Sequence, residues 1–311
     1  MFPHFEQMKD AMVLRNSLAP YIYTAARQHY DSGVSLVRPL YYEHPETEAA
    51  YTWADTQYYF GDSILVAPVA TAASTPDPYI GTTHKEMWIP PGAGWVDWNG
   101  MSTHFGPKVL SKNYSLSEIP LLVSAGSVVP LKTMASVSAL RPDPLVWAIF
   151  VPSSHVVEDT STCCSGTVCV GRGEVYEDDG ETKQYETSPG EWLTLEYSGD
   201  WTETVAVKIS PPSTLATGEA MGSRGHVLQL RGLLQHQTRK LVAVSVRVDG
   251  SEEKLEQLPD TAEAVENRAA AVGWWLHMGH SLSAPRGSII ISLGQHSKSH
   301  TIEATLTFAE G

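Results

Sequence analysis

Charged residues are scarce in this 311-residue chain, at 18% against roughly 25% in an average globular domain. Basic residues are the scarcer kind, with 21 Lys and Arg against 35 Asp and Glu, which gives a formal net charge of -14. Such a chain has no electrostatic footprint for phosphate backbones, so we expect no nucleic acid partner. The low charge, together with a hydrophobic fraction of 42%, also excludes a disordered chain and a coiled coil.

Long apolar runs are also missing. The longest, Ile119–Leu131, is interrupted by Pro120 and Gly126 and is shorter than the roughly 20 residues that span a bilayer. The amino terminus lacks a basic start followed by an apolar run, so we expect neither a membrane span nor an export signal. The sequence leaves the compartment undetermined.

Cysteine is rare, and its three copies lie within seven residues: Cys163, Cys164 and Cys169. One such cluster does not make a disulfide framework. It also lacks the second ligand pair that a zinc site needs, although His155 is nearby. A loop of free thiols is the expected interpretation, and its role stays unassigned. We expect no metal and no cofactor, because phosphate-loop, dinucleotide-binding and serine-nucleophile motifs are absent as well.

The pattern that is present begins with a helix. Apolar residues recur at three- and four-residue steps over residues 8–32, and Gly33 follows as the expected C-terminal cap. Pro20 lies inside this pattern and predicts a kink near Asn16. The next segment, Val34–Tyr42, is apolar on both faces, which predicts a strand buried in a parallel sheet.

After about residue 63 the hydrophobic period changes to two, with turns rich in Gly and Pro, of which the chain has 24 and 20. Short strands with regular turn signals predict two β-sandwiches, joined around Lys132–Asp143. The dipeptide Asn99-Gly100 is typical of a hairpin turn, and residues 257–272 suit a short helix. The expected strands are Ile64–Val69, Glu86–Ile89, Gly94–Trp98, Tyr114–Ser117, Leu121–Ser124, Val128–Leu131, Leu145–Val151, Gly173–Tyr176, Trp192–Tyr197, Thr204–Ile209, Lys240–Val248, Ser288–Leu293 and Thr301–Phe308.

An acidic segment, Val175–Glu181, is the most tempting catalytic motif. Glycoside hydrolysis needs two carboxylates that converge on one sugar, but Asp178 and Asp179 are adjacent and would point to opposite faces of a strand. The alternating spacing of a calcium loop is absent too. A strand that ends in an Asp-Asp-Gly turn is therefore the favoured interpretation.

Nine tryptophans leave two interpretations open. Exposed rings would form platforms for sugars, whereas large aromatic side chains also fill ordinary sandwich cores, which we favour. Trp274 and Trp275 are the pair most expected to leave one ring exposed. The nearby His277 and His280 have no third ligand for a metal.

Five blocks of this sequence, in one order, resemble the C-terminal part of family 31 glycoside hydrolases, the α-glucosidases, α-xylosidases and their relatives. The resemblance covers roughly residues 5–200. The matching blocks are Leu14–Arg27, Val37–Pro45, Gln57–Val69, Ile119–Pro130 and Tyr176–Thr182.

The resemblance implies a mainly β fold class: two tandem β-sandwich domains preceded by the last αβ unit of a truncated (β/α)8 barrel. Residues 1–62 would be the end of the barrel, 63–132 a proximal sandwich and 133–311 a distal one. A whole barrel needs about 250 residues, so this chain would contain only its last strand.

The resemblance also implies an enzyme: a retaining glycosidase that hydrolyses O-glycosyl bonds of α-glucosides through a covalent intermediate. Its two catalytic Asp residues lie upstream of every block found here, so we assign no catalytic, substrate-binding, cofactor or metal residue and expect this chain alone to be inactive. Arg38, Tyr41, Tyr42 and Glu43 follow the expected barrel strand, but pairing of Arg38 with a neighbouring carboxylate explains them equally well.

Two alternatives stay open: a non-catalytic carbohydrate-binding module, and a structural module that docks onto a separately encoded barrel. The expected partners are thus an α-linked glycoside, bound through the missing barrel, and such a barrel itself. We expect no membrane partner.

Overall fold

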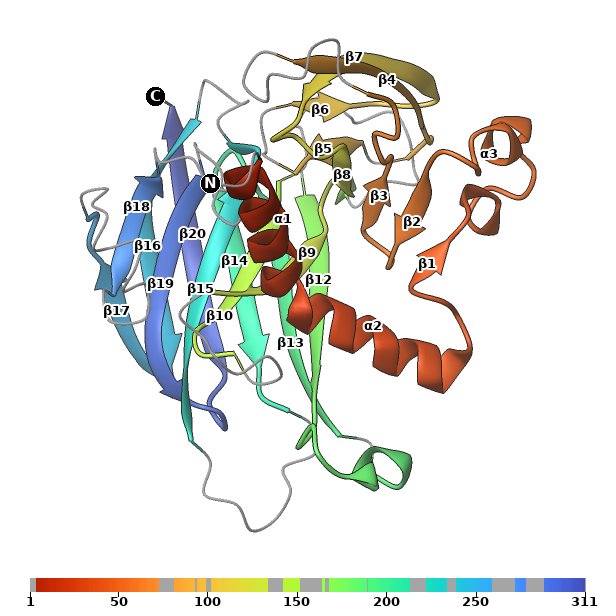
Figure 1. Cartoon of the computed structure of the whole chain (residues 1–311). Coiled ribbons are helices and arrows are strands. Elements are labelled where there is room, and N and C mark those ends of the chain that lie inside the picture. The colour runs from red at the N-terminus through yellow and green to blue at the C-terminus, as the bar shows by residue number, and fades with distance from the viewer. Residues whose placement is uncertain are drawn as a thin grey trace.

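Two helices lead into a chain that is otherwise built mostly of strands (Figure 1). The computed structural model describes residues 4–72, 81–92, 94–98, 102–133, 142–151, 164–165, 168–188, 190–212, 222–233, 239–258, 272–277 and 288–310. No helix in these ranges is long and apolar enough to cross a membrane. The predicted mainly β class is confirmed.

The predicted helix over 8–32 is present as two helices, α1 (Phe5–Ser17) and α2 (Ala19–Ser32), separated at Leu18. Pro20 lies in the first turn of α2, where its missing N–H would have no partner in any case. Gly33 caps α2 with a left-handed backbone, at φ 77°. The interruption predicted near Asn16 is therefore confirmed, two residues further along.

The prediction of one buried strand in a parallel sheet over Val34–Tyr42 was wrong. Only β1 (Val37–Arg38) is a strand, and it pairs antiparallel with β2 (Tyr58–Phe60). Pro39 follows and lacks the N–H that would continue the pairing, and Leu40–Tyr42 then form the 3-10 helix η1. The chain continues into the short helix α3 (Glu48–Thr52).

The first sandwich packs a six-stranded sheet, in the order β1-β2-β3-β8-β5-β6, against the hairpin β4-β7. Leu65 and Leu122 from the sheet meet Met87 and Trp88 from the hairpin, and Leu40 of η1 joins them in this core. The further strands are β3 (Ile64–Val66), β4 (Thr82–Ile89), β5 (Trp95–Asp97), β6 (Thr103–His104), β7 (Lys108–Ser115) and β8 (Leu121–Ser124).

The second sandwich packs a five-stranded sheet, β18-β19-β15-β10-β9, against a seven-stranded sheet, β11-β12-β13-β14-β20-β16-β17. The five strands are β9 (Val128–Lys132), β10 (Leu145–Phe150), β15 (Ser223–Arg231), β18 (Gly273–His277) and β19 (Ser288–Ser297). The seven are β11 (Cys164–Ser165), β12 (Val168–Glu177), β13 (Glu191–Asp200), β14 (Thr204–Ser210), β16 (Arg239–Val248), β17 (Ser251–Leu255) and β20 (Ile302–Glu310).

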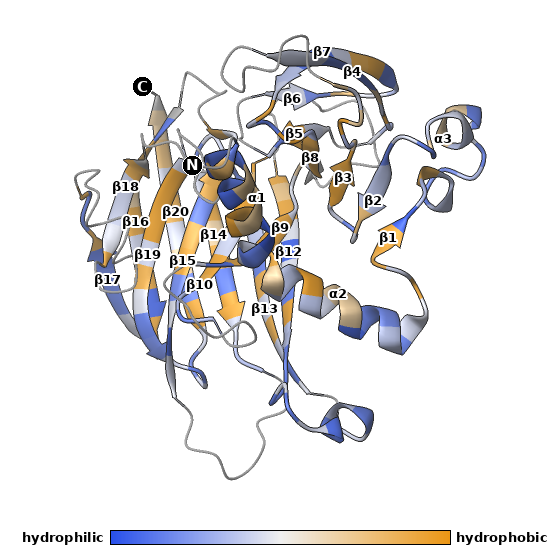
Figure 2. Cartoon of the chain, in the orientation of Figure 1, coloured by the Kyte–Doolittle hydropathy of each residue, from blue (hydrophilic) through white to orange (hydrophobic). Residues whose placement is uncertain are grey.

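The five-stranded sheet is buried on both faces, which explains its continuous hydrophobicity (Figure 2). Trp147 and Ile149 of β10 face the seven-stranded sheet. Val146, Ala148 and Phe150 face the other way, into a core shared with α1, α2 and the six-stranded sheet. This middle layer joins the two sandwiches.

The expected limits at residues 62 and 132 remain a prediction. Hydrogen bonding links β2 to β3 across the first limit and β9 to β10 across the second. The Asn99-Gly100 turn and nearly all of the helix predicted over 257–272 lie outside the described residues.

Candidate functional site

The acidic segment is a turn, as predicted. Asp178 accepts hydrogen bonds from the hydroxyls of Tyr23 (2.6 Å) and Tyr176 (3.0 Å) and from the Gly180 amide (2.8 Å). Asp179 accepts instead from its own loop, including the Thr182 amide at 3.0 Å. The two carboxylates have separate partner sets, so they do not form a pair that acts on one substrate.

Glu177 is a buried member of an ion pair. Its side chain is 3% exposed, and its two carboxylate oxygens lie 2.7 and 2.9 Å from the guanidinium of Arg224 on β15, which is 4% exposed. The Lys298 ammonium lies 4.0 Å away. This pair links the two sheets of the second sandwich, which is a structural role.

Residues in and around the acidic turn contact helix α2. The Arg27 guanidinium donates to the Tyr185 carbonyl oxygen at 2.8 Å and to the Tyr176 hydroxyl at 3.2 Å, and lies 4.9 Å from the centre of the Tyr176 ring. We call this group of Tyr23, Arg27, Tyr176, Asp178 and Tyr185 the α2 clamp. It brings together two of the five blocks singled out in the sequence.

Two tyrosine hydroxyls of the α2 clamp have raised pKa values. Burial, and then the hydrogen bond to Asp178, raise the pKa of Tyr23 and of Tyr176 above the ordinary value. Both hydroxyls therefore stay protonated donors at neutral pH. The Tyr176 amide also donates to the Thr24 hydroxyl at 3.0 Å, so backbone and side chain are fixed together.

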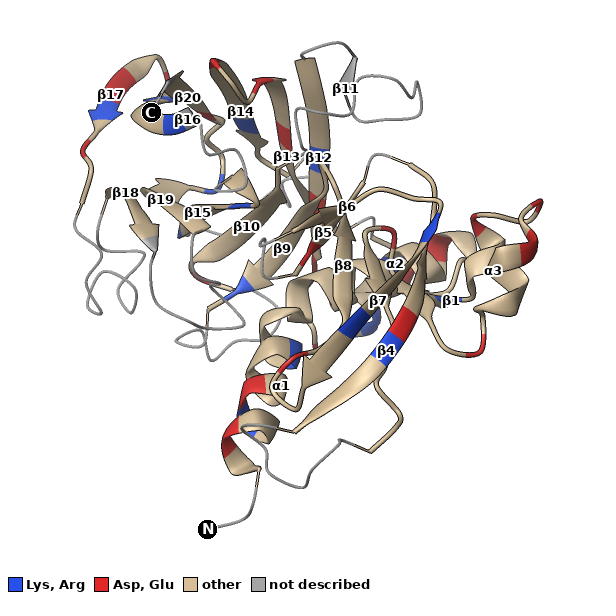
Figure 3. Cartoon of the chain, turned by 90° about the horizontal axis from the view of Figure 1, so that it is seen from above, with Lys and Arg blue, Asp and Glu red and all other residues tan. Residues whose placement is uncertain are grey.

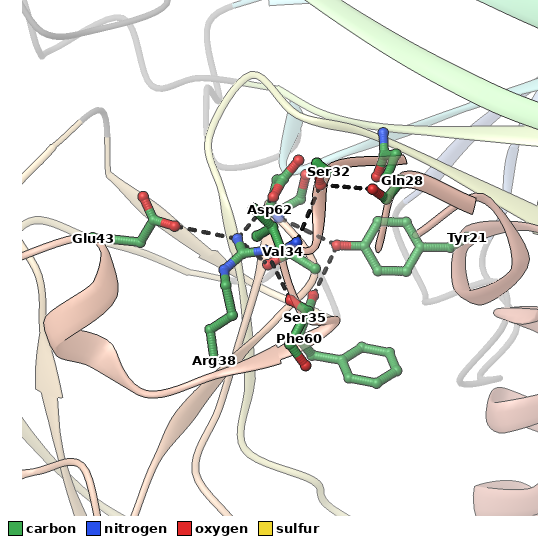
Figure 4. Close-up of polar contacts among 11 residues, drawn as sticks. Tyr21, Gln28, Ser32, Val34, Ser35, Arg38, Glu43, Phe60 and Asp62 are labelled. Atoms are coloured by element: carbon green, nitrogen blue, oxygen red, sulfur yellow. Dashed lines mark hydrogen bonds and ion pairs between the residues drawn. The ribbon is translucent and has the colours of Figure 1, made fainter. Parts of the chain in front are cut away.

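Arg38 is buried, with its side chain 5% exposed, at the end of β1 (Figure 4). Its Nη2 lies 2.7 Å from Asp62 Oδ1, 3.3 Å from Glu43 Oε1 and 3.1 Å from the Gly61 carbonyl oxygen. The expected carboxylate pairing of Arg38 is thus present. Both carboxylates are largely exposed, at 74% for Asp62 and 49% for Glu43.

Three tyrosines of η1 and α3 are exposed, and we call them the tyrosine face: Tyr41, Tyr42 and Tyr51. The rings of Tyr41 and Tyr51 stack with centres 5.0 Å apart and planes 10° apart. Between η1 and α3 in the chain, His44 Nε2 lies 2.9 Å from the Tyr59 hydroxyl, and burial lowers the pKa of His44. His44 is therefore a neutral hydrogen-bonding partner.

The tryptophans belong to the core, as favoured from the sequence. Seven of the nine are buried and none is exposed. The expectation that Trp274 or Trp275 leaves a ring exposed was wrong, because their exposures are 6% and 0%. The five-stranded sheet that holds them is covered on both faces.

The free-thiol interpretation was wrong for Cys169, which is disulfide-bonded. Cys163, His155, His280 and the side chain of His277 lie outside the described residues. Among the described residues, no group of three or more His, Cys, Asp or Glu side chains is placed to hold a metal ion.

Three arginines make hydrogen bonds between segments far apart in the sequence: Arg27, Arg224 and Arg231. The sequence did not lead us to predict this role for any of them. Arg231 is fully buried, donates to the Trp98 carbonyl oxygen at 3.1 Å and lies 4.5 Å from the centre of the Trp98 ring. It thereby joins β15 to the loop after β5. One sequence signal could have identified Arg231, because it directly follows the mostly apolar run Leu228–Leu230. A charged residue in such a run is expected to be buried and paired, since charged residues are rarely buried otherwise.

Comparison with known proteins gives one family. Residues 33–129 match the sequence profile of the glycosyl hydrolase family 31 C-terminal domain. The chain is 29% identical over 217 residues to neutral alpha-glucosidase AB of Homo sapiens. This alignment covers 69% of this chain and 20% of the human protein. It is 29% identical over 174 residues to the alpha-xylosidase of Saccharolobus solfataricus, covering 56% of this chain and 20% of that one.

Solved structures agree on the fold. The Flavobacterium johnsoniae GH31 dextranase FjDex31A, complexed with glucose, superposes with a TM-score of 0.72 and 20% identity. The superposition covers 99% of this chain and 33% of the dextranase. The aligned part of the chain spans about a fifth of the length of the human alpha-glucosidase and of the Saccharolobus alpha-xylosidase.

Proposed function

This chain corresponds to the C-terminal region of the family 31 glycoside hydrolases, and from that premise we propose that it is the β-sandwich support of a retaining enzyme that hydrolyses α-glucosides. The catalytic carboxylates come from a (β/α)8 barrel outside this sequence. The chain itself supplies the surface on which that barrel rests.

The observation that carries this proposal is uncovered apolar surface near the amino terminus. Among the described residues, nine of the seventeen exposed large hydrophobic side chains lie within residues 5–51. On α1 they are Phe5, Met8 and Met12, at 49%, 65% and 62% exposure and at helical spacing on one side. Apolar patches of this kind mark protein interaction sites.

The second uncovered patch is the tyrosine face with Val37, which is 51% exposed. This patch begins in β1, a strand of only two residues at the edge of the six-stranded sheet. Figure 2 shows β1, partly in hydrophobic colour, at the edge of the six-stranded sheet beyond β2. A partner that covered this patch would complete both the strand pairing and the apolar contact.

The α2 clamp gives the support its stiffness. It ties α2 to the distal sandwich through side chains 155 residues apart in sequence, Tyr23 and Asp178. Because α2 follows α1 and precedes β1 in the chain, the clamp holds the helix that lies in sequence between the two uncovered patches. We propose domain limits of 1–62 for the barrel end, 63–132 for the proximal sandwich and 133–311 for the distal sandwich.

The choice of α-glucosides among family substrates is also a proposal. It is supported by the name of the human relative, an alpha-glucosidase. A binding role that uses exposed tryptophan platforms is not supported, because none of the nine tryptophans is exposed.

Two assays test the proposal. The purified chain should release no p-nitrophenol from p-nitrophenyl α-glucoside above the buffer rate, and turnover proportional to chain concentration would refute it. The chain should also bind the dye anilinonaphthalene sulfonate, and Met8→Glu with Met12→Glu should reduce that fluorescence.

A matched control separates the amino-terminal patch from ordinary surface. Val109 and Leu116 are also exposed, at 50% and 48%, but lie in and just after β7 of the hairpin. Val109→Glu with Leu116→Glu should leave the dye fluorescence largely unchanged. Equal reductions by both pairs would show that no special apolar surface exists near residues 5–51.

A further inference from the structure

One row of alternating charge crosses the outer face of the seven-stranded sheet. We call it the charge ladder. Its members are direct cross-strand neighbours on β12, β13, β14, β20, β16 and β17, and Figure 3 shows the two colours on neighbouring strands β12 and β13. In spatial order they are Arg172, Glu196, Lys208, Glu303, Arg247 and Glu252.

The charge ladder is tightly paired at its ends and loosely paired in its middle. Arg172 lies 2.6 Å from Glu174, and Arg247 lies 2.9 Å from Glu252. Toward the middle, Arg172–Glu196 lengthens to 3.4 Å and Arg247–Glu303 to 4.0 Å. The Arg247–Glu252 pair is a cross-strand pair of the kind that stabilises a sheet, whereas Arg172 and Glu174 lie on the same strand.

Lys208 stands at the centre of the ladder. In the part of the chain that the structure describes, its ammonium makes no ion pair within 4.0 Å, although a glutamate lies opposite it on each side. The side chains of Glu196 and Glu303 are 52% and 49% exposed. Donor and acceptor groups in the middle of the ladder are therefore open to an external partner.

The middle of the ladder lines a shallow hollow of about 690 Å³ that is wide open to solvent. This volume falls in the roughly 300–1,000 Å³ range of ligand sites. Beside the ladder runs a parallel row of small side chains, Ser198, Ala206 and Thr305, which leaves room above the sheet. The lining extends over four strands, a span of about 14 Å at the usual strand spacing of about 4.8 Å.

The charges that line the hollow cancel, with Arg172 and Lys208 against Glu196 and Glu303. This local neutrality contrasts with the net charge of -14 of the chain. An anion or a cation would leave half of the lining groups repelled. A neutral ligand with many hydroxyls satisfies both kinds, since each hydroxyl donates to a carboxylate and accepts from an ammonium or guanidinium.

We propose that this hollow binds a linear, uncharged, α-linked glucan. Hydroxyls on successive sugar units pair with Glu196, Lys208 and Glu303, and the aliphatic stems of the ladder with Val170 and Ala206 contact the sugar C–H groups. The α-linkage rests on the proposed function, whereas neutrality and hydroxyl recognition come from the hollow itself. The site is for binding alone and holds the glucan near the enzyme.

Isothermal titration calorimetry of the purified chain with maltoheptaose tests the proposal. Saturable binding is expected, and Lys208→Ala should raise Kd by about tenfold, a loss equivalent to a charge-assisted hydrogen bond. Lys208→Ala with Glu303→Ala, which removes both kinds of charged group from the middle of the ladder, should abolish binding. The matched control is Lys240→Ala, which removes an equally exposed lysine outside the lining, on β16.

Each contrary result is decisive. No saturable heat with maltoheptaose overturns the site. So does binding that Lys208→Ala and the double variant with Glu303→Ala leave unchanged while circular dichroism stays native. Equal affinity for cellohexaose overturns the α-linkage. The outcomes that concern the site do not depend on the proposed function, which the p-nitrophenyl α-glucoside assay tests separately; only the α-linkage does.

Discussion

The buried ion pair of Glu177 and Arg224 yields the sharpest stability prediction. Glu177→Gln keeps the shape of the side chain but removes its charge, which leaves the Arg224 guanidinium buried without a counter-charge. The two contacts of 2.7 and 2.9 Å, and side-chain exposures of 3% and 4%, place this pair among buried ones. Breaking such a pair from one side costs about 3–5 kcal/mol. The Lys298 ammonium, 4.0 Å from Glu177 Oε2, loses this contact with a charged group as well.

The assay is urea unfolding at pH 7, followed by tryptophan fluorescence. A control on the same strand is Glu174→Gln, because Glu174 also pairs with an arginine at 2.6 Å, but that arginine, Arg172, is 57% exposed. An exposed pair of this kind contributes at most about 1 kcal/mol. The free energy of unfolding should therefore fall several times further in Glu177→Gln than in Glu174→Gln.

A double variant separates charge from shape. Glu177→Leu with Arg224→Met replaces both charges with apolar side chains and should recover most of the loss, because an apolar replacement of a buried pair is often neutral. Equal losses in Glu177→Gln and Glu174→Gln, or a double variant less stable than the single, would refute the reasoning.

Three further predictions concern His226, Gly61 and Asp178. Burial, then Arg224 and His296, lower the pKa of His226 to about 3, and its Nδ1 accepts from Trp147 Nε1 at 3.3 Å. Folded His226 stays neutral while the unfolded residue protonates near pH 6.5, so this group's contribution is complete above that pH and falls by about 2 kcal/mol at pH 5. His226→Gln should flatten that fall in a pH series of urea unfolding. Gly61→Ala places its Cβ 2.1 Å from the Tyr21 hydroxyl at φ 64°, whereas Gly33→Ala at φ 77° meets nothing within 4 Å. The Tm should fall in both variants, because alanine in a left-handed backbone conformation costs about 1–2 kcal/mol. It should fall clearly further in Gly61→Ala, and equal falls would contradict the close contact between Gly61 and Tyr21. Asp178→Asn weakens the α2 clamp, so hydrogen exchange should speed up in α2 but not in β10.

Much of the β architecture follows from hydrophobic period. Leu121–Ser124 is confirmed with both ends, and Thr301–Phe308 overlaps β20. In contrast, β15 escaped prediction, because Arg224, His226 and Gln229 are buried in it and break the apolar pattern. Arg224 and His226 have partners on other strands, Glu177 and Trp147, which a local pattern does not reveal. Gln229 accepts from Arg231 of the same strand.

Long-range pairing explains the other failures. Val34–Tyr42 has the composition of a fully buried strand, yet Arg38 turns inward to Asp62 and Pro39 ends the pairing after two residues. The α2 clamp likewise depends on residues more than 140 positions apart. The turn at Asp178 and Asp179 was predictable, but not its grip on α2.

The measurement that tests the central claim most directly is hydrolysis of p-nitrophenyl α-glucoside by the purified chain, with folding verified by circular dichroism. We predict a rate indistinguishable from buffer at every chain concentration, since the proposed function assigns the catalytic carboxylates to a barrel outside this sequence. A rate that rises with chain concentration and disappears on substitution of one of the chain's own carboxylates would contradict the account.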